Sequence, residues 1–291
     1  MSNDTSKAST TAQPRVWFIT GASRGFGALI AEQALAAGDA VVATARNPAT
    51  VTARLGEHPR LLPVALDVTR DDQAHAAVAQ ALKQFGRIDV LVNNAGYGLL
   101  GAVEESSAEE VQKVFSTNVF GLLAVTRAVL PQMREQRSGH VINLSSIGGY
   151  SAAFSGWGVY CATKFAVEGI SESLAIELAP LGIKVTVVEP GFFRTDFLDD
   201  SSLVKVAQNI GDYHETAGAM RDFAAEHNHQ QPGDPAKLAV AMLQLVNAKN
   251  PPVRLALGSD TVARIESKNA SVAKELNQWR ALALSTDFAA A

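Results

Sequence analysis

The stretch Val16-Trp17-Phe18-Ile19-Thr20-Gly21-Ala22-Ser23-Arg24-Gly25-Phe26-Gly27 decides the fold of this chain. It opens with a short apolar run, which is typical of a strand buried on both faces. Three glycines follow, and residues 28–37 after them are rich in alanine and leucine, which predicts a helix. Glycines let a backbone approach phosphate groups, and a helix N-terminus offers unpaired N–H donors. The stretch therefore predicts a dinucleotide-phosphate site, with a tight turn that binds nothing as the alternative.

Apolar runs and amphipathic segments alternate along the rest of the chain. Further strands are expected at 40–44, 61–66, 89–92, 140–144, 184–188 and 254–257, with helices at 71–85, 108–134, 159–179, 234–246 and 261–284. The strands are continuous apolar runs rather than alternating ones, which indicates a parallel sheet covered by helices on both faces. The prediction is an α/β fold with a doubly wound parallel sheet.

Composition narrows the class of protein. The chain has 291 residues, of which 47% are hydrophobic, and a net charge of −4 without a basic run. This composition gives an ample core and argues against nucleic acid as the main partner. The single cysteine, Cys161, excludes an intrachain disulfide and a multi-cysteine metal site, and it is compatible with the cytoplasmic location that we predict.

The first 14 residues are rich in serine, threonine and alanine and contain no apolar core stretch. They match neither a secretory signal nor a membrane span, so we expect a disordered tail at 1–14 and one domain at 15–291. No later segment is expected to cross a bilayer, and no membrane partner is predicted.

The end of the second strand bears on the choice of cofactor. Enzymes that use NAD commonly place an acid here for the ribose 2′-hydroxyl, but this chain has Thr44-Ala45-Arg46-Asn47. Arg46 and Arg24 are instead suited to a 2′-phosphate, which predicts NADP(H). The alternative is that Arg46 is a solvated residue of the loop.

Other special residues also fall just after strands, namely Asp67, Asn93, Ser146 and Pro190. Ligands of open α/β sheets bind at that edge, so these residues are expected to gather around one site. Asn118 lies inside the long helical stretch at 108–134, where it marks a kink or a bound water.

Tyr160 and Lys164 are four residues apart, which places both side chains on one face of a helix. A nearby ammonium favours the phenolate, so the phenol of Tyr160 exchanges a proton closer to neutral pH. Alone, such a pair is as well explained by an exposed helix surface. The convergence of special residues at one sheet edge favours a catalytic pair.

In this order, the motifs resemble those of the short-chain dehydrogenases/reductases over residues 16–195. They comprise Thr20-Gly21-x-x-x-Gly25-x-Gly27, Asp67, Asn93-Asn94-Ala95-Gly96, Asn118, Ser146, Tyr160-x-x-x-Lys164 and Pro190-Gly191. Within the family, the chain most resembles the branch of 17β-hydroxysteroid and retinol dehydrogenases. The resemblance implies a single Rossmann-type domain with seven parallel strands.

The resemblance also implies roles for individual residues. Tyr160 is the general acid in reduction and the base in oxidation, and Lys164 lowers its pKa and binds the nicotinamide ribose. Ser146 binds the substrate carbonyl, and Asn118 holds a water that relays protons to Lys164. The cofactor-binding residues that the pattern and the resemblance predict are Gly21, Ser23, Arg24, Gly25, Phe26, Gly27, Arg46, Asp67, Val68, Asn94, Ala95, Gly96, Tyr160, Lys164, Pro190, Gly191 and Thr195.

The interval from Ser146 to Tyr160 is one residue longer than the family's commonest spacing. The loop at 150–157 is long enough to absorb one residue, and Ser145 is the lesser candidate for the catalytic serine. The predicted function is an NADP(H)-dependent oxidoreductase that interconverts a carbonyl and an alcohol. A non-catalytic NADP-sensing protein is the alternative, although such a protein does not need Tyr160, Lys164 and Ser146.

In the last third of the chain, we expect part of a substrate site and no metal site. His214, His227 and His229 lack the spacing of a metal site, so no metal is predicted. Residues 198–231 have a weak pattern and are expected to form a mobile lid. The side chains expected around the nicotinamide are largely apolar: Tyr97, Leu99, Leu100, Tyr150, Phe154, Trp157, Phe192, Phe193 and Phe197. About half of them are expected to belong to the core. The others predict a bulky apolar substrate.

The helix at 108–134 and the helix of Tyr160 carry more apolar residues than one core-facing stripe requires. On the first helix these are Phe115, Val119, Leu122, Leu123 and Val125. The family usually pairs subunits through these two helices, so we expect a homodimer or a homotetramer.

Overall fold

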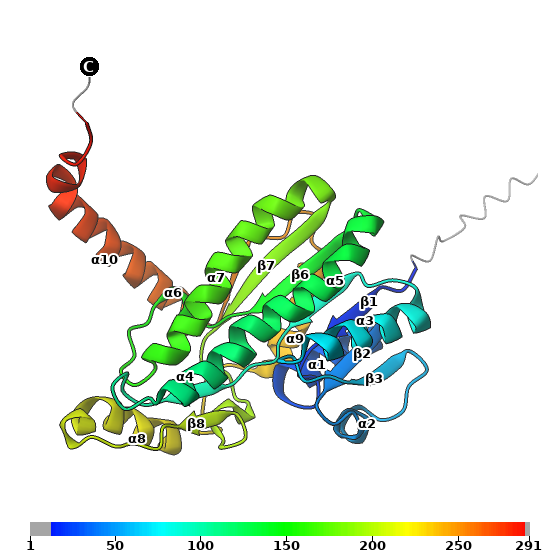
Figure 1. The fold of residues 1–291 in the computed structure, drawn as a ribbon, viewed down its shortest axis with the longest axis horizontal. Coiled ribbons are helices and arrows are strands. Elements are labelled where there is room, and N and C mark those ends of the chain that lie inside the picture. Colours follow the sequence, from blue (N-terminus) through cyan, green and yellow to red (C-terminus); the bar gives the residue numbers. More distant parts are fainter. Residues whose placement is uncertain (1–12, 289–291) are drawn as a thin grey trace, which may run out of the picture.

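The computed structural model describes residues 13–288 and shows a three-layer α/β domain (Figure 1). The tail predicted at 1–14 lies outside the described residues except for residues 13 and 14. One parallel sheet has the strand order β3-β2-β1-β4-β6-β7-β9. The strands are β1 Val16–Ile19, β2 Ala40–Ala45, β3 Leu61–Ala65, β4 Val90–Asn93, β6 Gly139–Leu144, β7 Ile183–Pro190 and β9 Arg254–Leu257. The doubly wound, seven-stranded parallel sheet is as predicted.

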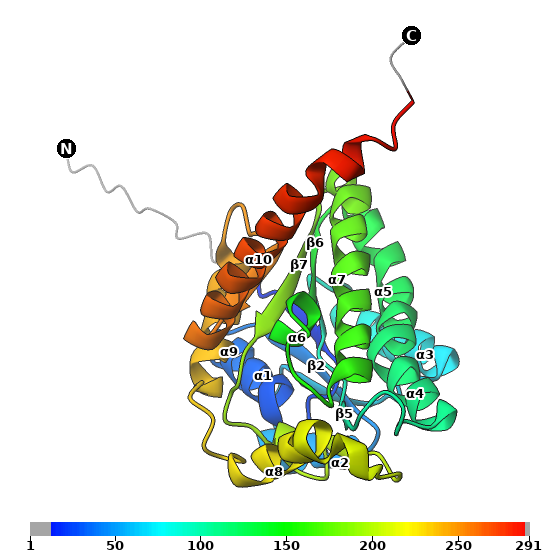
Figure 2. The ribbon, with the colours of Figure 1, turned by 90° about the vertical axis from the view of Figure 1, so that its left-hand side faces the viewer.

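Helices cover both faces of the sheet (Figure 2). Their bounds are α1 Gly25–Ala36, α2 Ala49–Leu55, α3 Asp71–Phe85, α4 Ala108–Phe115, α5 Leu122–Gln136, α6 Ile147–Tyr150, α7 Gly158–Leu178, α8 Ala219–Glu226, α9 Pro235–Asn247 and α10 Ser259–Leu284. One core contains Val78 of α3, Val125 of α5 and Leu178 of α7, while the other contains Ile30 of α1 and Met242 of α9. The two cores explain why the central strands are apolar on both faces.

The strand order reverses next to β1, because β2 and β3 lie on one side of it and β4 and β6 on the other. The loops after β1 and β4 therefore leave the sheet in different directions and open a crevice at its carboxyl edge. This crevice brings the glycine-rich turn beside the segment that follows β4.

Several short elements were not predicted. α2, α6 and α8 were missed, as was a two-stranded parallel sheet of β5 Gly98–Leu100 and β8 Leu203–Lys205. Elements of three to eight residues carry too few periodic positions to show in the sequence, and their pairing depends on distant contacts. The segment at 198–231 therefore contains β8 and α8 rather than a featureless loop.

A π-helical segment, Ser116–Gly121, joins α4 to α5 and contains Asn118. The kink expected at Asn118 is thus a local widening of a continuous helical stretch. Gly121 packs against the segment that follows β3: a Cβ on it would lie 2.7 Å from Val68 Cγ2.

The expectation that no segment is long and apolar enough to cross a bilayer was wrong for one stretch. Among the described residues, the helical stretch Ala108–Gln136 is long and apolar enough to span a membrane. However, 56% of its most apolar window is buried inside the protein. A helix that packs on the core of a domain passes the same test, so this property is weak evidence for a membrane span.

Buried amides join the middle of the sheet to both helices of one layer. Asn93 Nδ2 of β4 donates to Asn143 Oδ1 of β6 at 2.9 Å and to Thr126 Oγ1 of α5 at 2.9 Å. Asn143 Nδ2 donates in turn to Ser171 Oγ of α7 at 2.9 Å. The sequence showed Asn93 alone, because its partners come from three distant segments.

We expect Asn143→Leu to lower the free energy of unfolding by about 1–3 kcal/mol, because a buried donor of Asn93 loses its acceptor. Urea unfolding of the purified chain measures this change. Ser173→Ala on the exposed side of α7 is the control and should stay within about 0.5 kcal/mol of the wild type. A loss at Asn143 no larger than that of the control would contradict the network.

Candidate functional site

A cavity of about 1280 Å³ lies at the carboxyl edge of the sheet. It is large enough for both a dinucleotide and a substrate, since common ligand sites measure roughly 300–1,000 Å³. Most of the residues that the sequence predicts for the site line it: Gly21, Ser23, Arg24, Gly25, Phe26, Arg46, Asp67, Val68, Asn94, Ala95, Gly96, Ser146, Tyr160, Lys164, Pro190, Gly191 and Thr195. Gly27 and Asn118 lie behind this lining.

The glycine-rich turn has the shape that a phosphate site requires. Gly21 and Gly25 have φ angles of 65° and 53°, which disfavour other residues, and a Cβ on Gly25 would meet nothing within 4 Å. That space is open to a ligand. At Gly27 a Cβ would lie 2.5 Å from the Gly21 carbonyl oxygen, so only glycine fits there. Arg24 precedes α1 without a side-chain cap, which leaves the first N–H groups of that helix to a ligand.

Asn94 holds the turn in place from the end of β4. Its Nδ2 donates to the carbonyl oxygens of Thr20 and Gly21 at 2.8 and 3.0 Å. Thr20 Oγ1 accepts in return from the backbone N–H groups of Asn94 and Ala95. Asn94 therefore supports the glycine-rich turn, in addition to lining the cavity near the predicted cofactor ribose.

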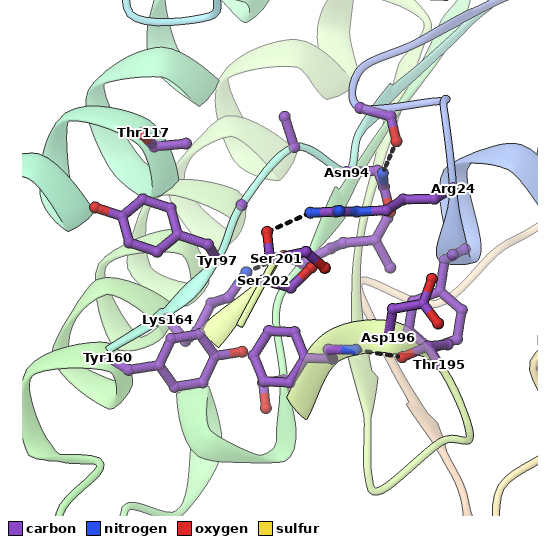
Figure 3. Close-up of a pocket in the computed structure, with 18 of the residues that line it drawn as sticks. Arg24, Asn94, Tyr97, Thr117, Tyr160, Lys164, Thr195, Asp196, Ser201 and Ser202 are labelled. Carbon is purple, nitrogen blue, oxygen red and sulfur yellow. Dashed lines mark hydrogen bonds between the residues drawn. The ribbon is translucent and has the colours of Figure 1, made fainter. Parts of the chain in front are cut away.

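The two arginines of the predicted 2′-phosphate site differ in their surroundings. Arg24 reaches across the cavity and donates to the carbonyl oxygen of Ser201, in the segment at 198–231 (Figure 3). Arg46 lines the cavity after β2, and within residues 13–288 it forms no ion pair. Arg46 is thus the arginine whose guanidinium is open to a phosphate.

Tyr160 and Lys164 project from α7 into the cavity, and both are buried (Figure 3). Lys164 Nζ donates to the carbonyl oxygen of Leu144, at the end of β6, at 2.7 Å. It lies 5.8 Å from the centre of the Tyr160 ring. Burial lowers the pKa of Lys164 to about 8, although the carboxyl of Glu168 opposes this effect.

Burial also raises the pKa of Tyr160 above its ordinary value, while the nearby Ser146 hydroxyl opposes the rise. In the protein without cofactor, desolvation thus outweighs the lowering that the sequence led us to expect from Lys164. The phenol is held in its protonated form, which is the form that a general acid needs.

The structure distinguishes the two candidate serines. Ser146 caps α6, where its Oγ accepts from the N–H of Gly148 at 3.1 Å, and it lies within hydrogen-bonding reach of Tyr160. Ser145 is buried, and its Oγ faces Glu168 on the far side of the turn. α6 and the turn before α7, where Gly156 has φ 75°, absorb the additional residue between Ser146 and Tyr160.

Asn118 is held rigidly behind the cavity. Its Oδ1 accepts from the N–H of Tyr97 at 3.1 Å, while its Nδ2 donates to the Tyr97 carbonyl at 2.9 Å and to Thr163 Oγ1 at 3.1 Å. A Cβ on Gly96 would lie 3.0 Å from Asn118 Oδ1 and 3.8 Å from Lys164 Nζ. The absence of a side chain at Gly96 thus lets this backbone pass close to Asn118 and Lys164.

Aromatic side chains form the wall next to Tyr160. The Trp157 and Phe197 rings stack at 6.2 Å, and Phe197 also lies 5.6 Å from the Tyr160 ring. Of the nine predicted apolar residues, six line the cavity: Tyr97, Phe154, Trp157, Phe192, Phe193 and Phe197. Leu99 and Leu100 belong to the core, and Tyr150 donates instead to Asn269 of α10 at 2.5 Å.

The segment at 198–231 is fastened to the loop before α4. The buried Glu105 accepts from the N–H of Ile210 at 2.9 Å and pairs with Arg221. Glu110 accepts from the N–H of Ala207 at 3.0 Å. From this segment, Phe223 packs on Phe192 with ring centres 6.3 Å apart. The sequence did not show Phe223 as part of the site, because its helix, α8, was missed.

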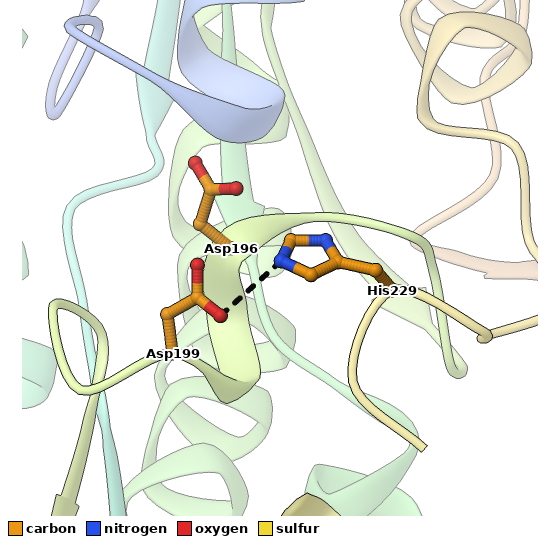
Figure 4. A group of neighbouring side chains, drawn as sticks. All are labelled: Asp196, Asp199 and His229. Carbon is orange, nitrogen blue, oxygen red and sulfur yellow. Dashed lines mark ion pairs between the residues drawn. The ribbon is translucent and has the colours of Figure 1, made fainter. Parts of the chain in front are cut away.

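The three histidines expected not to form a metal site lie in different surroundings. His229 Nε2 is 3.3 Å from Asp199 Oδ1, and Asp196 lies beside them (Figure 4). The His227 ring stacks on Phe223 at 4.0 Å. The ligand atoms of Asp196, Asp199 and His229 lie within 4.8 Å of one another, so this group has the donors for a metal ion, although the His229 side chain is 55% exposed.

The sequence is similar to those of several known oxidoreductases. It is 40% identical to oxidoreductase BOA17 of Botryotinia fuckeliana, over 94% of this chain and 99% of that protein. It is 40% identical to the 3-ketodihydrosphingosine reductase of Bacteroides thetaiotaomicron, over 84% of this chain and 88% of that protein. It is 37% identical to bovine retinol dehydrogenase 8, over 83% of this chain and 80% of that protein.

Solved structures agree with these relationships. A short-chain dehydrogenase from Streptomyces avermitilis superposes with a TM-score of 0.88 at 44% identity, over 95% of this chain and 100% of that one. A serine dehydrogenase in complex with NADP⁺ superposes with a TM-score of 0.69 at 28% identity, over 83% of this chain and 94% of that one. A 3-ketoacyl-(acyl-carrier-protein) reductase from Brucella melitensis, in complex with NADH, gives the same score and identity over 84% and 96%.

The family model described as short chain dehydrogenase matches residues 15–204, which include the glycine-rich turn, Ser146, Tyr160 and Lys164. This chain belongs to the short-chain dehydrogenase/reductase family and is an oxidoreductase.

Proposed function

We propose that this protein is an NADP(H)-dependent reductase or dehydrogenase that interconverts a bulky apolar carbonyl compound and its alcohol. One observation carries the proposal: Ser146, Tyr160 and Lys164 meet in one cavity that also contains the glycine-rich turn. The open space at Gly25, the uncapped start of α1 and the room in the cavity all fit a dinucleotide.

NADPH, when bound, supplies the hydride. In reduction, the Ser146 hydroxyl donates a hydrogen bond to the substrate's carbonyl oxygen and polarises it. The Tyr160 phenol, which is protonated at neutral pH, donates its proton to the same oxygen. The ammonium of Lys164 stabilises the phenolate that forms. Asn118, which lies behind the cavity, is assigned the water that returns a proton to Lys164.

A non-catalytic NADP sensor would need the glycine-rich turn but no proton donor. In this structure Tyr160 and Lys164 are buried, Ser146 lines the same cavity, and Lys164 is fixed by the Leu144 carbonyl. A buried ammonium lowers the stability of the fold, so a protein that keeps one is expected to use it. This favours the enzyme over the non-catalytic sensor.

Tyr160→Phe should lower kcat by about 10²–10⁴-fold, because it removes only the exchangeable proton. Steady-state absorbance of NADPH with a ketone panel measures the rate, while NADPH fluorescence and the melting temperature report binding and folding. We expect the last two to remain near wild type. Turnover within a few-fold of wild type would show that Tyr160 is not the acid.

The preference for the 2′-phosphorylated cofactor rests on the residues after β2. The three residues after Thr44 include no carboxylate. One of them, Arg46, lines the cavity and forms no ion pair among the residues described. Arg24 is already engaged by Ser201. We therefore assign the 2′-phosphate to Arg46 first, with Arg24 able to join it only if it leaves the Ser201 carbonyl.

Arg46→Ala should weaken NADPH binding by roughly 10–100-fold and leave NADH nearly unchanged, because a charge-assisted hydrogen bond is worth about 1.5–3 kcal/mol. Fluorescence titration with both cofactors measures the two affinities. Arg54→Ala is the matched control, since Arg54 pairs with Glu32 and does not line the cavity. Equal weakening of both cofactors, or a wild-type preference for NADH, would contradict the assignment.

The substrate class follows from the wall beside Tyr160. Phe154, Trp157, Phe192 and Phe197 present aromatic surface, and Phe223 extends it from α8. The similarity to a protein named 3-ketodihydrosphingosine reductase supports a long apolar ketone. Residues 198–231 cover this wall and act as the substrate lid; opening it would break the bond between Arg24 and Ser201.

Matched ketones with an alkyl chain, an aromatic ring or a carboxylate provide the test. We expect kcat/KM to rise by roughly threefold or more for each added buried methylene, because each contributes about 0.8 kcal/mol. Phe197→Ala should reduce this gain, whereas Val240→Ala, on the exposed side of α9, should not. The highest kcat/KM on small anionic ketones would refute the apolar pocket.

We also propose that the protein is a homodimer or homotetramer, which light scattering tests. We propose a cytoplasmic location, which cell fractionation tests. Three of the residues that the sequence offered for the interface, Val119, Leu122 and Val125, are instead buried in the subunit's own core. The exposed apolar side chains on the same helices are Phe120, Phe165 and Ile176, at 52%, 44% and 78% exposure. These residues, and not the buried ones, support an interface.

A further inference from the structure

A cluster of buried charges lies directly behind the catalytic helix and is not used by the mechanism above. Glu168, one turn after Lys164 on α7, pairs with Arg254 of β9. Arg254 Nη1 also contacts Glu189 Oε1, at the end of β7, at 2.8 Å. Glu168 and Glu189 are 3% and 1% exposed. The cluster thus joins α7 to two strands next to the catalytic lysine.

The charges in this cluster do not balance. Two buried carboxylates share one guanidinium, and that guanidinium also contacts Glu172 of α7, whose side chain is 56% exposed, at 2.9 Å. Arginine does not give up its proton, so one arginine neutralises only one of the buried acids. A second buried carboxylate is costly unless it binds a proton. Tyr150 adds its ring, 5.4 Å from the guanidinium, but no charge.

Glu168 also faces the turn that carries the catalytic serine. A Cβ on Gly149 would lie 2.4 Å from Ser145 Oγ and 3.0 Å from Glu168 Oε1, so both atoms border the same small space. Both are buried, and neither has an aligned hydrogen-bond partner. Ser145 nevertheless stabilises the charged form of Glu168. Glu168 therefore lies between Lys164, on the same helix, and Ser145, the residue that precedes Ser146.

We infer that Glu168 is a positioning residue that controls the protonation of Lys164: it is neutral in acid, and its negative charge above neutral pH keeps Lys164 as the ammonium. This inference rests on the proposed reaction only in that Lys164 must be charged for turnover. Residues i and i+4 of a helix are neighbours, and although the two side chains form no ion pair, the carboxylate acts on the ammonium through a buried region where charges are weakly screened.

The direction of the effect follows from the two pKa values. Burial and the neighbouring Glu189 raise the pKa of Glu168 to about 7, against the opposing effects of Ser145 and Arg254. The pKa of Lys164 is lowered to about 8 by burial. Glu168 thus gains its charge just below the pH at which Lys164 would lose its own. The other groups around Lys164, namely Tyr160, Cys161 and Asn118, carry no charge in that range.

The test is Glu168→Gln in the full chain, because glutamine imitates the protonated acid at all pH values. We expect kcat/KM to equal that of wild type near pH 6. We expect the alkaline limb of its pH profile to move down by roughly one pH unit. Glu168→Asp, which restores a charge, should recover part of the shift. A loss of activity that is the same at pH 6 and pH 9 would indicate a structural role only and would overturn the inference.

Glu172→Gln is the matched control, since it removes a carboxylate from the same arginine and the same helix but is exposed. Its alkaline limb should stay in place, and an equal shift in both variants would overturn the inference. A readout without turnover is NMR titration of ¹⁵N-labelled lysine side chains, with Lys164→Arg for assignment. Glu168→Gln should lower the pKa of Lys164 even if no carbonyl substrate is ever reduced, so failure of the proposed reaction and failure of this inference are distinguishable.

Discussion

The hydrogen bond from Lys164 Nζ to the Leu144 carbonyl oxygen is the constraint on which the site depends. An ammonium is strongly hydrated, and moving it into the interior is costly unless the protein supplies acceptors and nearby negative charge. Here a strand end supplies the acceptor, and Glu168 supplies the charge. α7 can satisfy Lys164 only by lying across the end of β6. That placement sets Tyr160 next to Ser146, which is two residues after Leu144.

The polar groups behind the site serve the same purpose. The Asn93–Asn143 pair ties β4 to β6, and Asn143 extends to Ser171 on α7. Asn94 and Thr20 bind each other across the crevice between β4 and β1. Because each of these side chains comes from a different element, none of the elements can shift without leaving a buried donor unsatisfied. The reactive groups are therefore positioned before any ligand arrives.

The sequence predicted the sheet and most of the cavity lining, because long periodic segments and glycines carry local signals. α3 was expected at 71–85 and occupies those residues. The pairing of β5 with β8, the engagement of Arg24 by Ser201 and the Glu168–Arg254 contact all join residues more than 80 positions apart. No local pattern encodes such contacts. The pKa of Tyr160 was misjudged for the same reason, since burial is a property of the folded chain.

Burial has opposite effects on the two groups of the catalytic pair, and this opposition shapes the whole site. It disfavours charge, so it keeps the proton on Tyr160 and tends to remove it from Lys164. A wetter cavity would relax both effects but would weaken the polarisation of the substrate by Ser146. The rings of Trp157 and Phe197 make the cavity wall next to Tyr160 apolar, and the charge that opposes the loss of the Lys164 proton comes from Glu168, on the protein side. The apolar substrate that we propose and the role that we infer for Glu168 thus both depend on the low dielectric of one cavity.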